Sequence, residues 1–252
     1  MGGVTIVNVL PRLLGTYGDS GNELALGHRL RARGIDVECV RVEPGAPIPE
    51  HGDIYLLGGG EDRAQALAAH LIGRGLMGPV DRGATVLAVC AGYQILGTSF
   101  TDSAGHTHPG LGLLDVETGP LAERAVGDAV VEPFIPVGTL VGFENHRGGT
   151  TLGADARPLG RVVRGVGNGP IERGPGRRPR RGHARKVVAS ASPSDGTEGA
   201  WQGRVFGTYL HGPVLALNPA FADHLLSLVV GELPALDDEY AARARTHRLP
   251  TA

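Results

Sequence analysis

The stretch ATVLAVCAGYQ, residues 84–94, joins a fully apolar run to a cysteine, two small residues and the start of a helical pattern. This layout is typical of a nucleophile elbow, in which a strand ends and a helix begins at the reactive residue. The turn is sharp, so small residues such as Ala91 and Gly92 are needed beside Cys90. An isolated cysteine is more often a buried structural residue. The flanking residues instead favour Cys90 as a catalytic nucleophile.

The segments around the elbow alternate between strand-like and helix-like patterns. Apolar or alternating runs predict strands at residues 4–10, 35–42, 53–57 and 84–89, and an Ala- and Leu-rich run predicts a helix over 62–76. Strands that alternate with helices predict a right-handed, doubly wound, mostly parallel α/β sheet with flanking helices.

A further helix is predicted between the first two strands. Ser20 and Glu23 have the spacing of a capping box, in which each side chain bonds to an orphan backbone amide. Gly34 is placed to end this helix in a left-handed conformation.

The second half of the chain is richer in strands and less regular. Strands are predicted at 129–131, 139–143, 187–191 and 205–209, followed by a helix at about 219–230 and a polar helical tail. The basic segment 172–186 has no large apolar residue and is expected to be a surface loop. A solvated insertion is the ordinary interpretation of such a segment, and contact with a partner or an anionic surface is the alternative.

Composition excludes several classes of function. The chain has 252 residues, 24 basic and 26 acidic, and the net charge of −2 argues against a nucleic-acid binder. Cys39 and Cys90 are too few for a disulfide framework or a four-thiolate zinc site, and no cluster has metal-ligand spacing, so no metal is expected. We expect a cytoplasmic protein without stable membrane insertion, because neither a signal peptide nor an apolar run of about 18 residues is present.

A thiol nucleophile needs a base, and histidine is the first candidate. His211 follows the apolar run 205–210, which places it at the carboxyl edge of a parallel sheet, where such folds bind ligands. His146 has a similar position and is the second candidate. The glycines at 58–60 also follow a strand and provide backbone donors for an anion or oxyanion.

Three motifs together resemble a known family. GGGED at 58–62, the elbow at 89–94 and GTYLHGP at 207–213 are similar to class I glutamine amidotransferases of the cobyric-acid-synthase type. Within that group, VGFENH at 141–146 and LNP at 217–219 resemble the GatD subunits of MurT–GatD lipid II isoglutaminyl synthases. The resemblance spans about residues 4–226. It implies a class I glutamine amidotransferase-like (flavodoxin-like) fold, with one glutaminase domain over 1–252 and a basic loop insertion.

The resemblance also implies roles for individual residues. Cys90 would attack the side-chain amide of L-glutamine, form a thioester and release ammonia, with His211 as base and then acid. Backbone amides near Gly59 and Ala91 would form the oxyanion hole. Arg124 would hold the glutamine, and a solvated surface charge is the alternative for it.

A partner subunit follows from the same resemblance. A MurT-like ligase would form a heterodimer with this chain, bind ATP and Mg²⁺, and use the ammonia to amidate D-glutamate of the peptidoglycan stem peptide. This chain itself would need no cofactor. Alternatives are a glutaminase for a cobyrinic-acid-type cofactor amidation, a cysteine hydrolase of the same fold, and a non-catalytic binding subunit.

Two positions depart from the family pattern. Ala88 replaces the first glycine of the elbow, a small change that the turn can tolerate. Pro213 stands two residues after His211, where the usual triad has a carboxylate. Either a distant residue orients the imidazole, or the partner subunit supplies an acid across the interface. The second option predicts weak glutaminase activity for the isolated chain.

Overall fold

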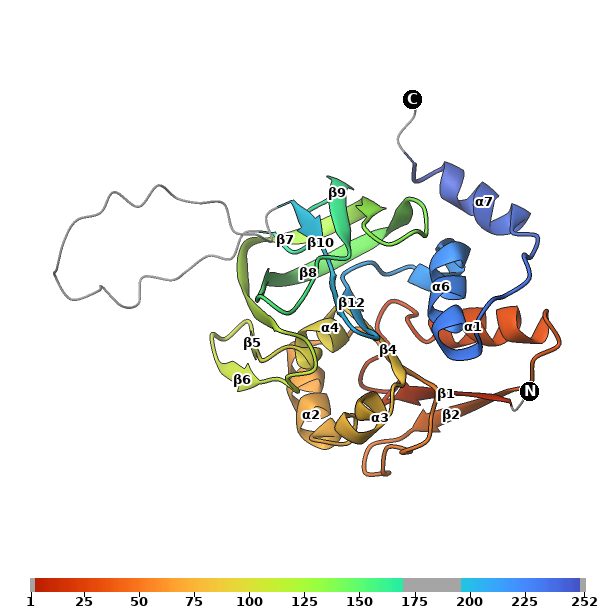
Figure 1. Ribbon diagram of the computed structural model, residues 1–252. Coiled ribbons are helices and arrows are strands. Elements are labelled where there is room, and N and C mark those ends of the chain that lie inside the picture. Colours follow the sequence, from red (N-terminus) through yellow and green to blue (C-terminus); the bar gives the residue numbers. More distant parts are fainter. Residues whose placement is uncertain (1–2, 170–195, 250–252) are drawn as a thin grey trace, which may run out of the picture.

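The structure is a computed structural model that describes residues 3–169 and 196–249 (Figure 1). Its first sheet has the strand order β11-β12-β4-β3-β1-β2. The strands are β1 Val4–Val9, β2 Val37–Val42, β3 Ile54–Leu57, β4 Thr85–Val89, β11 Ala200–Gln202 and β12 Val205–Thr208. All neighbours pair in parallel except β11 with β12. The prediction of a doubly wound, mostly parallel sheet is therefore confirmed.

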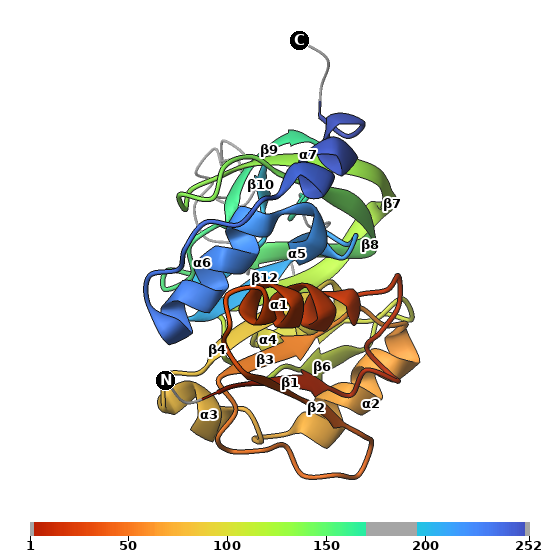
Figure 2. The same ribbon diagram turned by 90° about the vertical axis from the view of Figure 1, so that its right-hand side faces the viewer.

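Helices cover both faces of this sheet. The helices among the described residues are α1 Gly21–Arg31, α2 Asp62–Ile72, α3 Met77–Asp81, α4 Ala91–Leu96, α5 Val214–Leu217, α6 Pro219–Val230 and α7 Glu239–Thr246. In the two views α1 and α6 lie side by side on one face, while α2 and α3 lie on the other (Figures 1 and 2). Among the described residues, no helix combines the length and the apolar character needed to span a membrane.

Burial on both faces explains why the central strands are continuous apolar runs. Every residue of β3 and β4 is buried. Sheets covered on both sides have this pattern, because neither face meets water. Each fully buried Val, Leu or Ile side chain contributes roughly 1.5–3 kcal/mol to folding. The well-packed centre of the first sheet therefore supports the loops that follow its strands at the carboxyl edge.

A second sheet lies over the carboxyl edge of the first. Its strands are β5 Ser99–Thr101, β6 Thr107–Pro109, β7 Val116–Pro133, β8 Leu140–Leu152, β9 Gly160–Arg164 and β10 Thr197–Glu198. The order is β10-β9-β7-β5-β6, and β8 pairs with β7. Phe143 of β8 pairs with His211, just beyond β12, so the long β7–β8 hairpin meets the first sheet where its strands end.

Some local predictions are wrong. The capping box does not form, because Ser20 makes no side-chain cap bond and Glu23 instead accepts a hydrogen bond from Asn8 Nδ2 at 2.8 Å. The helix predicted over 62–76 is interrupted at Gly73, whose φ of 48° ends α2 before α3 begins. Gly34 does adopt the left-handed conformation expected of it, with φ of 70°.

Other predictions have no test in this structure. The strand predicted at 187–191 and the basic segment 172–186 lie outside the described residues. The assignment of residues 1–252 to one domain stays a prediction.

Candidate active site

The chain makes the expected sharp turn at Cys90. This residue lies between β4 and α4 with φ of 52° and ψ of −109°, a backbone conformation that residues other than glycine seldom adopt. A Cβ on Gly92 would lie 2.8 Å from Leu57 Cβ and 2.9 Å from the Gly58 carbonyl oxygen. The turn therefore needs glycine two residues after the cysteine, which is the physical reason for the elbow pattern.

A buried histidine–aspartate pair lies beside this turn. His211 Nδ1 is 3.0 Å from both carboxylate oxygens of Asp19, and neither side chain is exposed to solvent. The other ring nitrogen, Nε2, is buried and makes no hydrogen bond to the described residues. A Cβ on Gly59 would meet His211 Cε1 at 2.8 Å, Asp19 Oδ2 at 3.2 Å and Cys90 Cβ at 3.4 Å. The three side chains thus converge on one glycine.

The surroundings of His211 favour its charged form. Burial opposes a charge on the ring, but the hydrogen bond with Asp19 and the interaction with Cys90 outweigh it and raise the pKa of His211 to about 9. The imidazole is therefore protonated at neutral pH. A cationic imidazole stabilises a neighbouring thiolate, which is the nucleophilic form of a cysteine.

Asp19 is the functional candidate that sequence reasoning missed. Of the two options for the group that orients His211, the structure has the distant residue of the same chain. Pro213 cannot play this part and instead packs against α1, since a Cβ on Gly21 would lie 2.2 Å from Pro213 Cγ. One signal could have pointed to Asp19: it lies in the loop after β1, at the same carboxyl edge that singled out His211.

The predicted oxyanion donor at Gly59 needs a correction. Its N–H donates to Asp19 Oδ2 at 2.8 Å, so this amide holds the acid rather than facing an oxyanion. Gly60 and Ala91 both line the pocket around Cys90. Their amides make no hydrogen bond to the described residues. Glycine is needed at 59 for the close approach of His211, which is a different reason from the predicted one.

The pocket around Cys90 has a volume of about 300 Å³. Such a volume suits a small ligand. Its charged lining separates by sign. The acidic residues Glu61, Asp62 and Asp102 come from the start of α2 and the β5–β6 hairpin. The basic residues Arg124 and Arg147 come from β7 and β8. Two of the acids are already engaged, since Asp62 accepts a hydrogen bond from the Ser103 amide and Asp102 is bonded to His108.

The structure places Arg124 on the wall of this pocket. Its Nε donates to Asn145 Oδ1 at 2.6 Å. Neither Nη makes a hydrogen bond to the described residues. The guanidinium edge that binds a carboxylate bidentately is therefore available.

His146, the second candidate for the base, also lines the pocket, but its nitrogens are engaged. Nδ1 lies 2.8 Å from the Gly148 carbonyl oxygen and Nε2 lies 3.4 Å from Glu144. The ring stacks on Tyr209 with centroids 3.7 Å apart. With an acceptor at each nitrogen, His146 is less suited than His211 to take a proton from Cys90.

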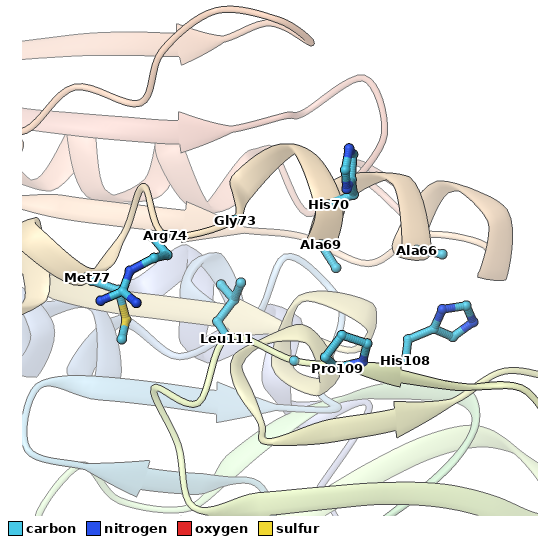
Figure 3. Close-up of a pocket in the computed structure, with 10 residues that line it drawn as sticks. Ala66, Ala69, His70, Gly73, Arg74, Met77, His108, Pro109 and Leu111 are labelled. Carbon is cyan, nitrogen blue, oxygen red and sulfur yellow. The ribbon is translucent and has the colours of Figure 1, made fainter.

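A larger pocket of about 500 Å³ lies between α2, the start of α3 and the strand β6. Figure 3 shows that His70, Arg74 and His108 on its walls do not point toward one another. No cysteine lines it, so the Cys90 pocket is the better candidate for catalysis. In the parts of the chain that are described, no group of three or more His, Cys, Asp or Glu is arranged to hold a metal ion.

The parallel sheet of this chain presents Cys90 at the turn from β4 to α4, and His211 lies just beyond the adjacent strand β12. The model of the CobB/CobQ-like glutamine amidotransferase domain matches residues 5–219, and the chain belongs to this family. It is thus an enzyme of the glutamine amidotransferase type.

Two relatives share the name lipid II isoglutaminyl synthase (glutamine-hydrolyzing) subunit GatD. The one from Staphylococcus aureus is 35% identical and the match covers 88% of this chain and 83% of the relative. The one from Streptococcus pneumoniae is 30% identical over 93% of this chain and 86% of the relative. A cobyric acid synthase from Brucella abortus is 33% identical over 70% of this chain, but the match covers only 32% of that protein.

Solved structures show the same fold at low sequence identity. A glutamine amidotransferase from Thermotoga maritima is 14% identical with a TM-score of 0.51, covering 98% of this chain and 94% of that one. The glutaminase domain of Trypanosoma brucei CTPS, solved with bound acivicin, is 11% identical with a TM-score of 0.51, covering 93% and 97%. The predicted class I glutamine amidotransferase-like fold is confirmed.

Proposed function

We propose that this chain is the glutaminase subunit of a two-protein lipid II isoglutaminyl synthase. The observation that carries the glutaminase half is the buried Asp19–His211 pair beside the Cys90 elbow. The lipid II half is supported by the two GatD relatives, which match over most of their length. A cobyrinic-acid-type amidation is the alternative, suggested by the cobyric acid synthase match.

The proposed reaction has two halves. The Cys90 thiolate attacks the side-chain amide carbon of L-glutamine, and the tetrahedral intermediate collapses when the His211 imidazolium protonates the leaving nitrogen. Ammonia departs and a γ-glutamyl thioester remains. His211 then takes a proton from water, which attacks the thioester and gives glutamate and the free thiolate. Asp19 keeps Nδ1 protonated and the ring in place throughout.

We assign the oxyanion hole to the backbone amides of Gly60 and Ala91. Both residues line the pocket beside Cys90. Removing one such donor typically costs about 3 kcal/mol of transition-state stabilisation. Ala91 keeps the role that the sequence predicted for it, and Gly60 replaces Gly59.

The charges of the pocket suit the zwitterion of a free amino acid. Arg124 and Arg147 would bind the α-carboxylate, and Glu61 on the opposite wall would face the α-ammonium group. A volume of about 300 Å³ fits glutamine better than the extended chain that a cysteine peptidase must hold. These features favour an amidotransferase over a cysteine hydrolase of the same fold.

Arg124→Gln is expected to raise KM for glutamine by about 10- to 100-fold and to change kcat much less. The reason is the loss of a charge-assisted, two-pronged bond to the carboxylate, which is typically worth about 1.5–3 kcal/mol. Arg124→Lys keeps the charge without the fork and should give an intermediate KM. Steady-state ammonia release measures both constants. An unchanged KM in Arg124→Gln would identify Arg124 as a surface charge.

The partner would be a MurT-like ligase that binds ATP and Mg²⁺ and receives the ammonia to amidate D-glutamate of the stem peptide. Both relatives are named as a subunit of a synthase, which supports such a heterodimer. The chain itself would bind no cofactor and would act in the cytoplasm.

The test is ammonia release from L-glutamine by the chain alone and with a co-expressed MurT-like ligase. Because Asp19 lies in this chain, we expect the chain alone to hydrolyse glutamine. Amidation of lipid II should need the ligase and ATP in addition. The cobyrinic-acid alternative would be supported by a different result. In that case the chain hydrolyses glutamine and supports amidation of a cobyrinic-acid-type substrate by the synthetase for that substrate, but it supports no amidation of lipid II.

A further inference from the structure

A chain of hydrogen bonds runs along the wall of the Cys90 pocket. Arg124 Nε donates to Asn145 Oδ1 at 2.6 Å, and Asn145 Nδ2 donates to the Tyr17 hydroxyl at 2.7 Å. The Tyr17 ring lies edge-on to the imidazole of His211, with centroids 5.0 Å apart. We propose that Asn145 is a positioning residue that couples recognition of the substrate carboxylate to the alignment of the catalytic histidine.

On one side, Asn145 orients the arginine. A guanidinium has five N–H donors in one plane, so a bond at Nε fixes the direction of the Nη edge. With Nε committed to Asn145, that edge is the part of Arg124 left for a carboxylate. This step rests on the proposed role of Arg124 in binding glutamine.

On the other side, Asn145 holds a ring that covers His211. Tyr17 has φ of 61°, a backbone conformation that a non-glycine residue keeps only when its surroundings enforce it. Besides the edge-on contact with His211, two contacts with described residues hold its side chain: the bond from Asn145, and an edge-on contact with Phe143 at 5.4 Å. Tyr17 is 40% exposed, so burial alone does not fix it.

The loop that carries Tyr17 also carries Asp19. Thr16 N–H donates to the Gly59 carbonyl at 3.1 Å, and Asp19 accepts from the Gly59 amide at 2.8 Å. Tyr17 lies between these two anchors. A displaced Tyr17 would therefore disturb the acid that is bonded to His211.

The position of Asn145 on β8 allows it to reach both sides. Residues two apart in a strand face the same way, so Phe143 and Asn145 share one face. Phe143 packs against the His211 ring, with centroids 5.3 Å apart, and Asn145 reaches past it to Arg124. One face of one strand thus contacts the substrate arginine, the covering tyrosine and the catalytic histidine.

Three variants separate the two sides of the coupling. Tyr17→Phe removes only the hydroxyl, and we expect kcat to fall about 3- to 10-fold with KM within about 2-fold of the wild type. Asn145→Leu has a similar shape but makes neither bond, so KM should rise about 10-fold and kcat should fall by as much as in Tyr17→Phe. Asn145→Asp is the rescue variant, because it accepts from Arg124 and also from the tyrosine hydroxyl, and both constants should stay within about 3-fold.

The double variant Tyr17→Phe/Asn145→Leu tests whether the residues act in series. We expect the kcat of Asn145→Leu alone, since the same contact is lost in both. Additive effects on kcat would overturn the coupling. A second result would also overturn the coupling. If Asn145→Leu lowers kcat only in proportion to the fraction of protein whose Cys90 can be alkylated, and KM is unchanged, the variant is partly unfolded and the remaining folded enzyme is normal.

The same series separates this proposal from the one on which it rests. If Arg124→Gln raises KM but Asn145→Leu does not, the coupling is wrong and the role of Arg124 stands. If neither raises KM, the carboxylate role of Arg124 is wrong and the coupling is overturned with it. If the wild-type chain and its complex release no ammonia from glutamine, the glutaminase proposal itself fails.

Discussion

Asp19→Asn is expected to lower kcat for glutamine hydrolysis by about 10³- to 10⁴-fold, as removal of the acid does in comparable triads. Asp19 is buried and both its oxygens lie 3.0 Å from His211 Nδ1. An asparagine has no charge to balance an imidazolium, and its amide can leave the histidine in the wrong tautomer. The substitution changes little in volume, so loss of activity would report on the pair and not on packing.

The pH dependence provides a second readout for the same variant. The raised pKa of His211, about 9, keeps the imidazolium charged up to that pH. Since the leaving nitrogen must be protonated by His211, kcat/KM should fall as the pH rises through about 9. In Asp19→Asn, burial still lowers the pKa and the opposing hydrogen bond to a carboxylate is gone. The fall should therefore begin at a lower pH.

A matched control is Asp128→Asn, which removes a carboxylate from an exposed ion pair with Arg248. Such pairs contribute little, and we expect its glutaminase rate to equal that of the wild type. Asp19→Asn activity within about tenfold of the wild type, together with an unshifted pH profile, would contradict the triad. The acid would then have to come from the partner subunit.

The centre of the fold could be predicted from the sequence because the central strands are buried on both faces. The runs of β3 and β4 are almost entirely apolar, and β1 has only Thr5 and Asn8 as polar residues, so the existence of these strands could be predicted without any alignment. Cys90 and His211 could be placed for the same reason. Both follow such a run, and parallel strands bring their carboxyl ends to one edge.

Asp19 could not be found from local spacing, because it is 192 positions from His211 in the sequence. The position where the family spacing places the acid is occupied by Pro213, which has no carboxylate. Only the three-dimensional approach of the loop before α1, anchored on Gly59, brings the carboxylate to the imidazole. The bond made by the Gly59 amide could not be predicted for the same reason, since it depends on where Asp19 lies.

The β7–β8 hairpin was predicted only in fragments. β7 runs from Val116 to Pro133, but its pairing with β8 is irregular between Pro120 and Ala125. Exposed and buried residues along it do not alternate regularly, so the period-two signal of a half-buried strand is weak. This hairpin supplies Arg124 and Asn145, which is why the wall of the pocket was harder to predict than its nucleophile.

Cys90→Ser is expected to abolish glutamine-dependent amidation, with a fall in kcat of at least about 10³-fold, while ammonia-dependent amidation by the complex stays within about 2-fold. Serine fits the strained turn at φ of 52° as cysteine does. Its hydroxyl is far harder to ionise than a thiol, so the His211 imidazolium no longer faces a nucleophilic anion. The ligase reaction needs only ammonia, which a high concentration of ammonium salt at mildly alkaline pH supplies.

Comparing the two nitrogen sources in one reconstituted complex separates loss of the nucleophile from damage to the complex. The assay uses lipid II, ATP and the co-expressed ligase, with either glutamine or ammonium chloride. Loss of both activities would point to a damaged complex and not to a missing nucleophile. Full glutaminase activity in Cys90→Ser would show that another residue attacks the amide. If Cys90→Ser loses amidation with glutamine but keeps amidation with ammonium chloride, a non-catalytic binding subunit is excluded. Substitution in such a subunit would affect amidation with both nitrogen sources equally or with neither.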